Sequence, residues 1–357
     1  MEYIELEKTN ILIEDGDRGK NYPSPNELMN DGYCLFLNNK NIIDNKLSCT
    51  HAVYISKAKH EKLRSGSLTK GDIVITTRGT IGNILLVDKH FPLPARINSG
   101  MVIIHAQKEY IPKFLYFYFE TSIFKEQIKF LQSGAAQPQL PIKDLQKILI
   151  PTLPIKKQQH IVNTIGSVDD LIENKQKKVM QLERISSLIY VKYTKEKESI
   201  INLGDVCEIK TGKLDANAAI INGAYPFFTC GKDTLKIDDF AFDDESIIIS
   251  GNGDIQVKYY KGKFNAYQRT YVLSPKKYFF LFLEECKSSV GELMNNSQGS
   301  VIKFITKGML EKISVPVNDN AEEIDNKLRN LYNQISLTKK EIEGLTMIKK
   351  TLLSKYF

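Results

Sequence analysis

Three residues in the second half of the chain could support metal-dependent phosphodiester chemistry. Asp244 precedes an apolar, strand-like run, and Gln256 and Lys258 follow it. Carboxylate and amide oxygens would hold a hard divalent cation, while the lysine would stabilise the charge that develops on a phosphate. The same residues also suit an ordinary strand with an acidic turn before it and a basic end after it. Because the first half of the chain has no lysine at the corresponding place, the nuclease is the less favoured interpretation.

Other catalytic patterns are missing from the sequence. It has no GxxxxGK[ST] phosphate loop, no strand-associated GxGxxG, no GxSxG nucleophile elbow and no NPPY or DPPY tetrapeptide. None of the five histidines forms an HExxH or HxH pair. Asp15 and Asp17 lie beside basic residues and suit a loop ion network better than a general-acid pair. We therefore predict no catalytic residue and no metal site in this chain.

Polar and basic side chains instead gather on glycine-bearing loops in both halves. Lysine and arginine bind phosphates, and arginine, asparagine and glutamine read base edges through paired hydrogen bonds. For any one of these residues, an ordinary solvated loop is the simpler interpretation. The predicted DNA-binding residues of the first half are Arg18, Lys20, Asn21, Arg78, Arg96, Gln137 and Gln139. Those of the second half are Lys213, Lys232, Asn252, Lys258, Arg269 and Gln298.

The composition allows a polyanionic partner and argues against several classes of protein. A chain of 357 residues suits about two domains, and 49 Lys+Arg against 42 Asp+Glu give a formal charge of +7. No apolar run approaches the roughly 18 residues of a membrane helix, and the acidic N-terminal segment does not resemble a signal peptide. Five scattered cysteines fit a reducing compartment, so we expect a cytoplasmic protein.

The chain repeats its own order of elements. LQKILIP at 145–151 matches LEKISVP at 310–316, and IVITTRGTIG at 73–82 matches IIISGNGDIQ at 247–256. An aromatic stretch with a helical pattern follows each of the two strand-like runs. Several matches in the same order at a nearly constant offset predict an internal duplication.

A long heptad pattern follows each half of the duplication. Apolar residues recur in alternating steps of four and three over 155–198 and again over 318–357, which predicts two long helices with one apolar seam each. Each seam needs a partner, and the natural partner is the other helix of the same chain. The residues predicted to pair the helices are Ile161, Ile165, Val168, Ile172, Val179, Leu182, Ile324, Leu328, Leu331, Ile335, Ile342 and Leu345.

Two polar residues, Lys175 and Thr338, occupy the fifth step of their seams. In an antiparallel pair of helices they would lie near each other in the middle layer, where polar residues cost stability but fix the register. The alternative is that both residues lie at the solvent edge of the seam.

These patterns divide the chain into a globular unit, a long helix, a second globular unit and a second long helix. Proline suits a helix start and disfavours helix just before itself, and prolines stand before both heptad segments. The predicted domains are residues 1–154, 155–198, 199–317 and 318–357.

Together these features resemble the specificity (S) subunit of type I restriction-modification systems. The second unit opens INLGDVCEIKTGK and continues with AYPFFTCGK and FDDESIIISGNGD, which look like the start of a target recognition domain. The first unit carries DGDRGKNYP and GYCLFLNNKNI. The first spacer, LPIKKQQHIVNTIGSVDDLIENKQKKVMQLE, is similar to the family's run of Pro and Gln-Gln before a heptad helix. The resemblance covers essentially the whole chain.

The resemblance implies a non-catalytic chain with two target recognition domains of mixed α/β fold, each reading one half of a split DNA sequence. The long helices would pair as an antiparallel coiled coil that sets the gap between the halves. Two methyltransferase (M) subunits with S-adenosylmethionine would methylate adenine, and restriction (R) subunits with ATP and Mg would translocate and cut DNA. A methylation-only system fits the same resemblance, and a coiled-coil scaffold without a DNA role is an alternative outside it.

The second spacer, VNDNAEEIDNKL, departs from the family pattern because it has no Gln-Gln, and the second unit is shorter than the first. We therefore expect imperfect symmetry between the two halves and allow for a weaker methyltransferase site on one of them.

Overall fold

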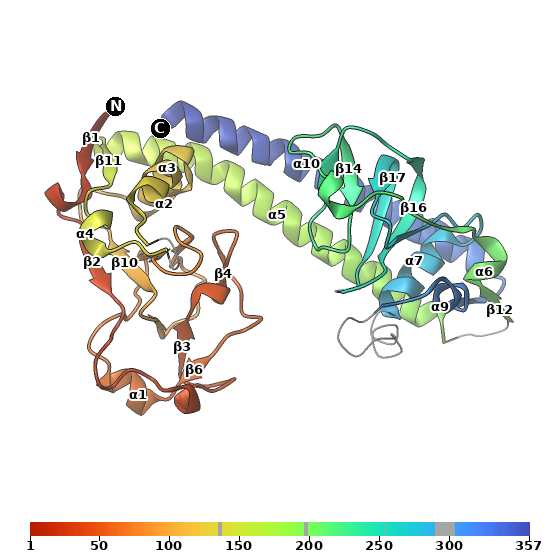
Figure 1. The fold of residues 1–357 in the computed structure, drawn as a ribbon, viewed down its shortest axis with the longest axis horizontal. Helices are drawn as coiled ribbons and strands as arrows, with labels where there is room; N and C mark the ends of the chain where they lie inside the picture. The colour runs from red at the N-terminus through yellow and green to blue at the C-terminus, as the bar shows by residue number, and fades with distance from the viewer. Residues whose placement is uncertain (135–137, 196–198, 254, 290–303) are drawn as a thin grey trace. The chain divides into compact units, whose positions relative to one another are not determined.

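The computed structural model describes residues 1–134, 138–195, 199–253, 255–289 and 304–357 (Figure 1). The chain forms two compact units. The first comprises residues 1–173 and 343–357, and the second comprises residues 174–342. This division differs from the predicted boundaries because each long helix contributes one part of its length to each unit.

The first unit contains a four-stranded antiparallel sheet of order β2–β10–β7–β8, whose strands are Leu12–Asp15, Met101–His105, Ile73–Thr76 and Ile84–Leu86. A second sheet has the order β6–β3–β9, with strands Tyr54–Ile55, Cys34–Leu37 and Ala95–Ile97. In that sheet β3 and β9 run parallel. Strand β1 (Glu2–Glu5) pairs with β11 (Leu149–Thr152), which leads into the first long helix.

The second unit contains one six-stranded sheet of order β13–β18–β16–β17–β14–β15. Its strands are Ile209–Thr211, Thr270–Leu273, Phe242–Ser250, Val257–Ala266, Tyr225–Phe228 and Leu235–Ile237. Here β14 and β17 run parallel. Strand β12 (Ser199–Asn202) pairs with β19 (Ser314–Val317), which leads into the second long helix.

The two units share one topology, so the duplication predicted from the sequence is present in the fold. Strands β2, β10 and β7 correspond to β13, β18 and β16, and the registers agree. Ile104 pairs with Ile73 in the first unit, just as Leu273 pairs with Ile247 in the second. The parallel pair β3–β9 corresponds to β14 and the end of β17. The long strand β17 therefore stands where the first unit has the separate strands β8 and β9.

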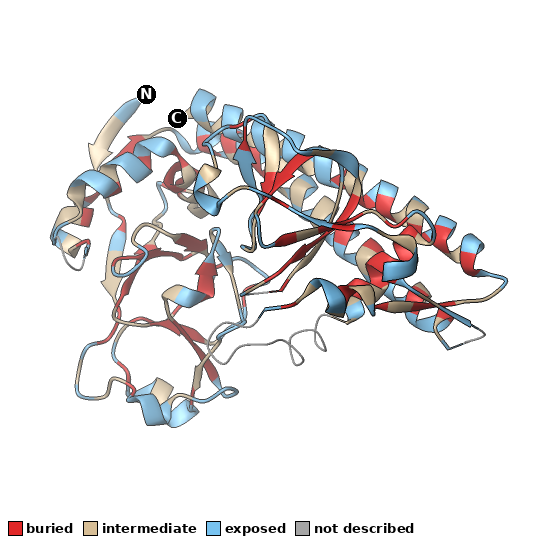
Figure 2. Cartoon of the chain, turned by 45° about the vertical axis from the view of Figure 1, so that its right-hand side comes forward, coloured by how far each residue is buried: buried red, intermediate tan, exposed pale blue. Residues whose placement is uncertain are grey.

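Short helices cover the sheets. They are α1 (Lys57–Lys62), α2 (Pro112–Glu120), α3 (Ser122–Leu131) and α4 (Ile142–Leu145) in the first unit, and α6 (Leu203–Val206), α7 (Phe279–Ser288) and α9 (Lys307–Glu311) in the second. The aromatic stretches of the sequence form α2 and α7, and most of their side chains are buried (Figure 2). Across the described ranges, no helix has both the length and the hydrophobicity that a bilayer span requires.

The long helices α5 (Ile155–Tyr193) and α10 (Ala321–Tyr356) run antiparallel within each unit. In the first unit, the Lys349 ammonium lies 2.8 Å from the Asp169 carboxylate. In the second, the Lys175 ammonium lies 2.7 Å from the Glu341 carboxylate, and the Lys339 ammonium lies 3.0 Å from the Glu183 carboxylate. Higher residue numbers on one helix thus meet lower numbers on the other, as in the predicted coiled coil.

The seam residues differ in how deeply they are buried. Six are buried: Ile161, Ile165, Val179, Leu182, Leu328 and Ile335. The others are half-buried: Val168, Ile172, Ile324, Leu331, Ile342 and Leu345. Thr338 is only 2% exposed, so the solvent-edge alternative is wrong for this residue. Lys175 is half-buried, and its ammonium turns to Glu341, one helical turn from Thr338.

One side chain of each long helix anchors it to the neighbouring aromatic helix. In the first unit, the buried Gln158 amide accepts a hydrogen bond from the Ile111 N–H at the start of α2 and donates to the carbonyls of Glu109 and Leu153. In the second unit, Asp325 accepts hydrogen bonds from the first N–H groups of α7, at 2.7 and 3.0 Å. Gln158 thus binds the residue that precedes α2, and Asp325 satisfies N–H groups of α7 that have no partner within that helix.

The Lys349 ammonium is the counter-charge of two carboxylates at a largely buried site. Its loss should therefore destabilise the first unit. Its ammonium lies 2.7 Å from Glu120, and burial raises the pKa of the Glu120 carboxyl. Because Lys349→Met leaves a buried carboxylate without its counter-charge, we expect a loss of about 3 kcal/mol in the free energy of unfolding, measured by urea denaturation. The exposed neighbour provides the control, Lys350→Met, which should change little. Equal stability of the two variants would contradict the role assigned to Lys349.

Candidate nucleic-acid interface

Loops from five places in the first unit meet at one end of its sheets. Strand β10 is antiparallel to both β2 and β7, so its start lies beside their last residues, Asp15 and Thr76. Strands β3 and β9 are parallel and end together. We call this end of the unit the loop edge. It comprises residues 16–21, 38–41, 77–83, 98–100 and the described part of 133–140.

Backbone hydrogen bonds join these loops directly. The Asn98 N–H donates to the Leu37 carbonyl at 3.0 Å, and the Leu140 N–H donates to the Thr77 carbonyl at 2.9 Å. The Thr77 N–H donates to the Gly100 carbonyl at 2.8 Å. Main-chain atoms therefore hold much of the loop edge together, and side chains such as those of Lys20 and Arg78 are left exposed.

The second unit builds an equivalent loop edge from residues 212–214, 229–232, 251–253, 267–269 and 304–305. The Tyr267 N–H donates to the Phe228 carbonyl at 2.9 Å, and the Ile305 N–H donates to the Gly251 carbonyl at 3.0 Å. The Gly251 N–H donates to the Arg269 carbonyl at 2.8 Å. Each of these bonds has its counterpart in the first unit, so the same frame is built twice from different residues.

A close approach of two loops requires glycine at the same place in both frames. A Cβ atom at Gly16 would overlap the carbonyl oxygen of Asn98, and one at Gly212 would overlap that of Ala266. Neither obstacle is a side chain that could move away. The loop after β2 and the loop after β13 can therefore approach the next loop only where the chain has glycine.

Most of the predicted DNA-binding residues lie on the two loop edges. Exposed or half-buried in the first unit are Arg18, Lys20, Asn21, Arg78 and Gln139, and in the second Lys213, Lys232, Asn252 and Arg269. Arg18 is held in place by hydrogen bonds to Asp15 and to the Ser99 carbonyl, yet its side chain is 48% exposed. Gln137 and Gln298 lie outside the described residues.

Arg96 is a correction to the predicted set. It is 7% exposed and lies in β9 behind the loop edge. Its guanidinium donates to the ring and carbonyl of His60 and to the carbonyls of Leu63 and Ser65, at 2.8 to 3.2 Å. Because these bonds occupy the guanidinium inside the domain, Arg96 stabilises the 60–65 segment and is not available to a nucleic acid.

Lys258 is also assigned a structural role. Its ammonium donates to the carbonyls of Gly231 and Lys232 at 2.9 and 2.8 Å, and burial lowers its pKa. The lysine thus holds the 231–232 loop from behind. In the β16–β17 pair, Lys258 stands opposite Ile248, whereas Asp244 stands opposite Gly262. Four residues along a strand is about 13 Å, which separates Asp244 from Lys258 and argues against the nuclease interpretation.

Asn39 is a loop-edge residue that the sequence prediction did not include. Its side-chain amide donates to the Arg78 carbonyl, and its buried Oδ1 atom has no hydrogen-bond partner among the described residues. The run of asparagines directly after a buried strand, LNNKN at 37–41, is the signal that could have indicated it.

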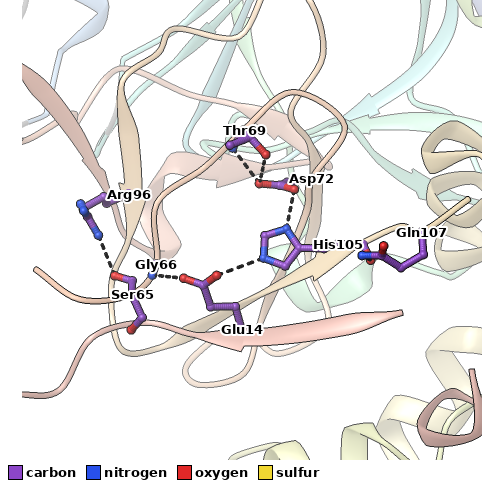
Figure 3. A network of polar contacts seen from close by, with 8 residues as sticks. All are labelled: Glu14, Ser65, Gly66, Thr69, Asp72, Arg96, His105 and Gln107. Atoms are coloured by element: carbon purple, nitrogen blue, oxygen red, sulfur yellow. Dashed lines mark hydrogen bonds and ion pairs between the residues drawn. The ribbon is translucent and has the colours of Figure 1, made fainter. Parts of the chain in front are cut away.

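A network of side chains fixes the sheet of the first unit behind its loop edge (Figure 3). The His105 ring lies between two carboxylates, 2.7 Å from Asp72 and 3.1 Å from Glu14. Asp72 also accepts hydrogen bonds from Thr69, and Glu14 accepts one from the Gly66 N–H. The hydrogen bond to Asp72 is the largest of the contributions that raise the pKa of His105 above its usual value.

This network predicts that the first unit loses stability as pH rises. Because the folded-state pKa of His105 is raised, its stabilising effect is complete below the usual value of 6.5 and is lost as pH passes the folded-state pKa. The melting temperature of the native chain should therefore fall through this range more steeply than that of His105→Gln. His51→Gln, at an exposed site, should behave like the native chain. Parallel pH profiles for all three would contradict the prediction.

The different positions of Arg96 and Arg18 predict different effects of the same change. Arg96→Met removes buried charged hydrogen bonds and should cost on the order of 3 kcal/mol in the free energy of unfolding. Arg18→Met should leave stability within about 0.5 kcal/mol and weaken DNA binding. Urea denaturation and a binding titration of the two variants distinguish these effects. Unchanged stability of Arg96→Met would contradict the structural role of Arg96 and would favour a role in DNA binding.

Comparisons with known proteins agree with the duplicated fold. The model of the type I restriction modification DNA specificity domain matches residues 13–184 and again residues 195–347. The match to a crystal structure of the type I restriction-modification system S subunit from M. genitalium spans 100% of this chain and 96% of that chain. Its TM-score is 0.62 at 19% sequence identity. The predicted fold class, two α/β domains each followed by a long helix of an antiparallel pair, is confirmed.

Curated relatives point to the same family. The EcoDI specificity subunit of Escherichia coli is 41% identical over 155 residues, 42% of this chain, and the match spans about a third of that relative (34%). The MjaIX specificity subunit of Methanocaldococcus jannaschii is 24% identical over 336 residues, covering 80% of this chain and 76% of the relative. The two domain matches together cover most of the sequence, so this chain belongs to the type I restriction modification DNA specificity family.

Proposed function

We propose that this chain is the DNA specificity subunit of a type I restriction-modification system and performs no catalysis itself. Each loop edge reads one half of a bipartite, gapped DNA site. The observation that carries the proposal is the duplicated frame, in which equivalent main-chain bonds present two sets of outward-facing basic and amide residues. Membership of the DNA specificity family supports the same function.

The chemistry of the loop edges suits this role. The exposed lysines, such as Lys20, Lys213 and Lys232, suit phosphate contacts that position the domain on a duplex without reading its sequence. Arginine and amide side chains at the same edges suit base contacts in the major groove. Rigid main-chain support beneath them lowers the ordering cost of binding.

The long helices separate the two reading units along the chain. A continuous helix has a fixed rise of about 1.5 Å per residue, so it suits a spacer that keeps the gap between the half-sites constant. Their outer faces carry exposed apolar residues that the pairing of the helices does not use: Met180, Ile185, Leu188, Val191, Leu337, Met347 and Ile348. Such residues support docking of partner subunits.

The partners of this chain are then methyltransferase (M) subunits, two in number, together with restriction (R) subunits. The M subunits bring S-adenosylmethionine for methylation of adenine, and the R subunits bring ATP and Mg for cleavage. A system of this kind acts on cellular DNA, so we place the chain in the cytoplasm.

A binding selection from random duplex DNA tests the proposal. The full-length chain, in complex with the methyltransferase subunit that copurifies with it, should enrich two short blocks separated by a constant unspecified gap. Binding should fall steeply between 50 and 200 mM salt because phosphate contacts release counterions. If the selection enriches no common sequence block, or if the affinity for DNA does not depend on salt, the chain is better explained as a scaffold without a role in DNA recognition.

A further inference from the structure

At one pair of equivalent positions, both units place a residue type that reads base edges. Arg78 of the first unit directly follows Thr77, whose N–H binds the Gly100 carbonyl. Asn252 of the second directly follows Gly251, whose N–H binds the Arg269 carbonyl. The two residues therefore occupy equivalent positions in the main chain of the two loop edges.

The turn that follows is also the same. Gly79 has φ of 69° and Gly253 has φ of 71°, a left-handed conformation that glycine adopts without strain. Each residue also forms an isolated β-bridge to the segment before the last short helix, Arg78 to Gln139 and Asn252 to Phe304. The main chain on both sides of Arg78 and Asn252 is thus fixed in the same way.

At several other equivalent positions of the two loop edges, only one unit has a guanidinium or an amide. The strand registers align Arg18 with Leu214, Gly100 with Arg269 and Ser99 with Gln268. The bridges just described align Gln139 with Phe304. Asn83 and Gln256 also align and have an amide in both units, but the Asn83 amide donates to the Ile42 carbonyl within the first unit. Arg78 and Asn252 are therefore the described pair that offers a guanidinium or amide to a ligand in both units.

Both side chains are free to bind a ligand. Arg78 is exposed, and within the described residues its guanidinium has no hydrogen-bond or ion-pair partner, in contrast to the buried Arg96. Asn252 is half-buried, and its side-chain amide likewise has no partner in the described part of the chain. Their backbones, however, are held firmly, and the Asn39 amide binds the Arg78 carbonyl.

We propose that Arg78 and Asn252 are the equivalent base-reading residues of the two units. Arg78 recognises a guanine through its O6 and N7 acceptors, and Asn252 recognises an adenine through its N6 donor and N7 acceptor, the pairings that suit these side chains in the major groove. This inference rests on the proposed function and adds the identity of one base in each half-site.

Exchanging the two residues tests the proposal. In the binding selection with the full-length complex, Arg78→Asn should change one guanine of one block to adenine and leave the other block unchanged. Asn252→Arg should change one adenine of the other block to guanine. The expected change in preference between the two bases is about tenfold or more. Lys20→Asn and Lys232→Asn are matched controls, which should weaken binding to all sequences without changing either block.

A second measurement uses modified DNA and covers the case in which an exchange variant binds too weakly for selection. Replacing the guanine by 7-deazaguanine removes the N7 acceptor and should weaken binding of the native complex about tenfold. The same replacement should have no effect on the Arg78→Ala complex. 7-Deazaadenine in the other block should give the same pattern with Asn252→Ala.

The outcomes separate the two proposals. If the native complex selects no sequence, the proposed function fails. If it selects two blocks but neither exchange alters a base, and deaza bases affect native and alanine variants equally, then the assignment of Arg78 and Asn252 is wrong while the function stands. A changed base in the block of the altered unit alone supports both.

Discussion

The register of one central strand in each unit determines where the loop edge forms. Strand β10 pairs with β2 on one side and β7 on the other, and β18 pairs with β13 and β16 in the same way. Alternate residues of β10 enter different cores: Val102 and Ile104 pack with α2, whereas Met101 and Ile103 pack with β3 and β9. A slip of one residue would exchange the two faces, so both cores specify the register. The same register brings the Thr77 N–H to the Gly100 carbonyl, and the loops assemble from there.

The attachment of each long helix to its unit shows that geometry is kept while the chemistry changes. A buried carboxylate from the aromatic helix meets the long helices in both units. In the first, Glu120 is met by the Lys349 ammonium. In the second, Glu284 accepts hydrogen bonds from the hydroxyls of Tyr332 and Ser187. An ion pair in one unit and hydroxyl hydrogen bonds in the other both satisfy a carboxylate removed from water.

The Gln-Gln run that is absent from the second spacer has a similar explanation. In the first unit, Gln158 binds the chain at the start of α2. In the second, Asp325 makes the equivalent contact at the start of α7, and it lies further along its own helix than Gln158 does. The departure from the family pattern therefore replaces the anchoring residue and keeps the anchor.

Sequence patterns predicted the features that repeat along a line: buried strand runs, aromatic helices and heptad seams. They could not predict which polar residues face inward, because that depends on carbonyls supplied by distant segments. Arg96 has the same residue type and loop-like setting as Arg78, but the 60–65 segment surrounds its guanidinium. Lys258 was misassigned for the same reason, since the 231–232 carbonyls take its ammonium. The predicted domain boundaries treated each helix as one segment, whereas its two ends pack in different units.

The main chain joins the loops, and the side chains form the outer surface of the loop edge. This difference explains how the same frame can carry two different surfaces. The bonds between loops that the two units share are made by backbone N–H and carbonyl groups, which every residue type except proline can supply. The frame itself constrains mainly glycines, at close approaches such as Gly16 and Gly212 and at the left-handed turns of Gly79 and Gly253. Within the described residues, the Arg78 side chain forms no hydrogen bond or ion pair, so its replacement removes no such bond from the frame. On the proposed function, recognition can therefore change one residue at a time in one unit, while the frame of that unit and the whole of the other unit stay as they are.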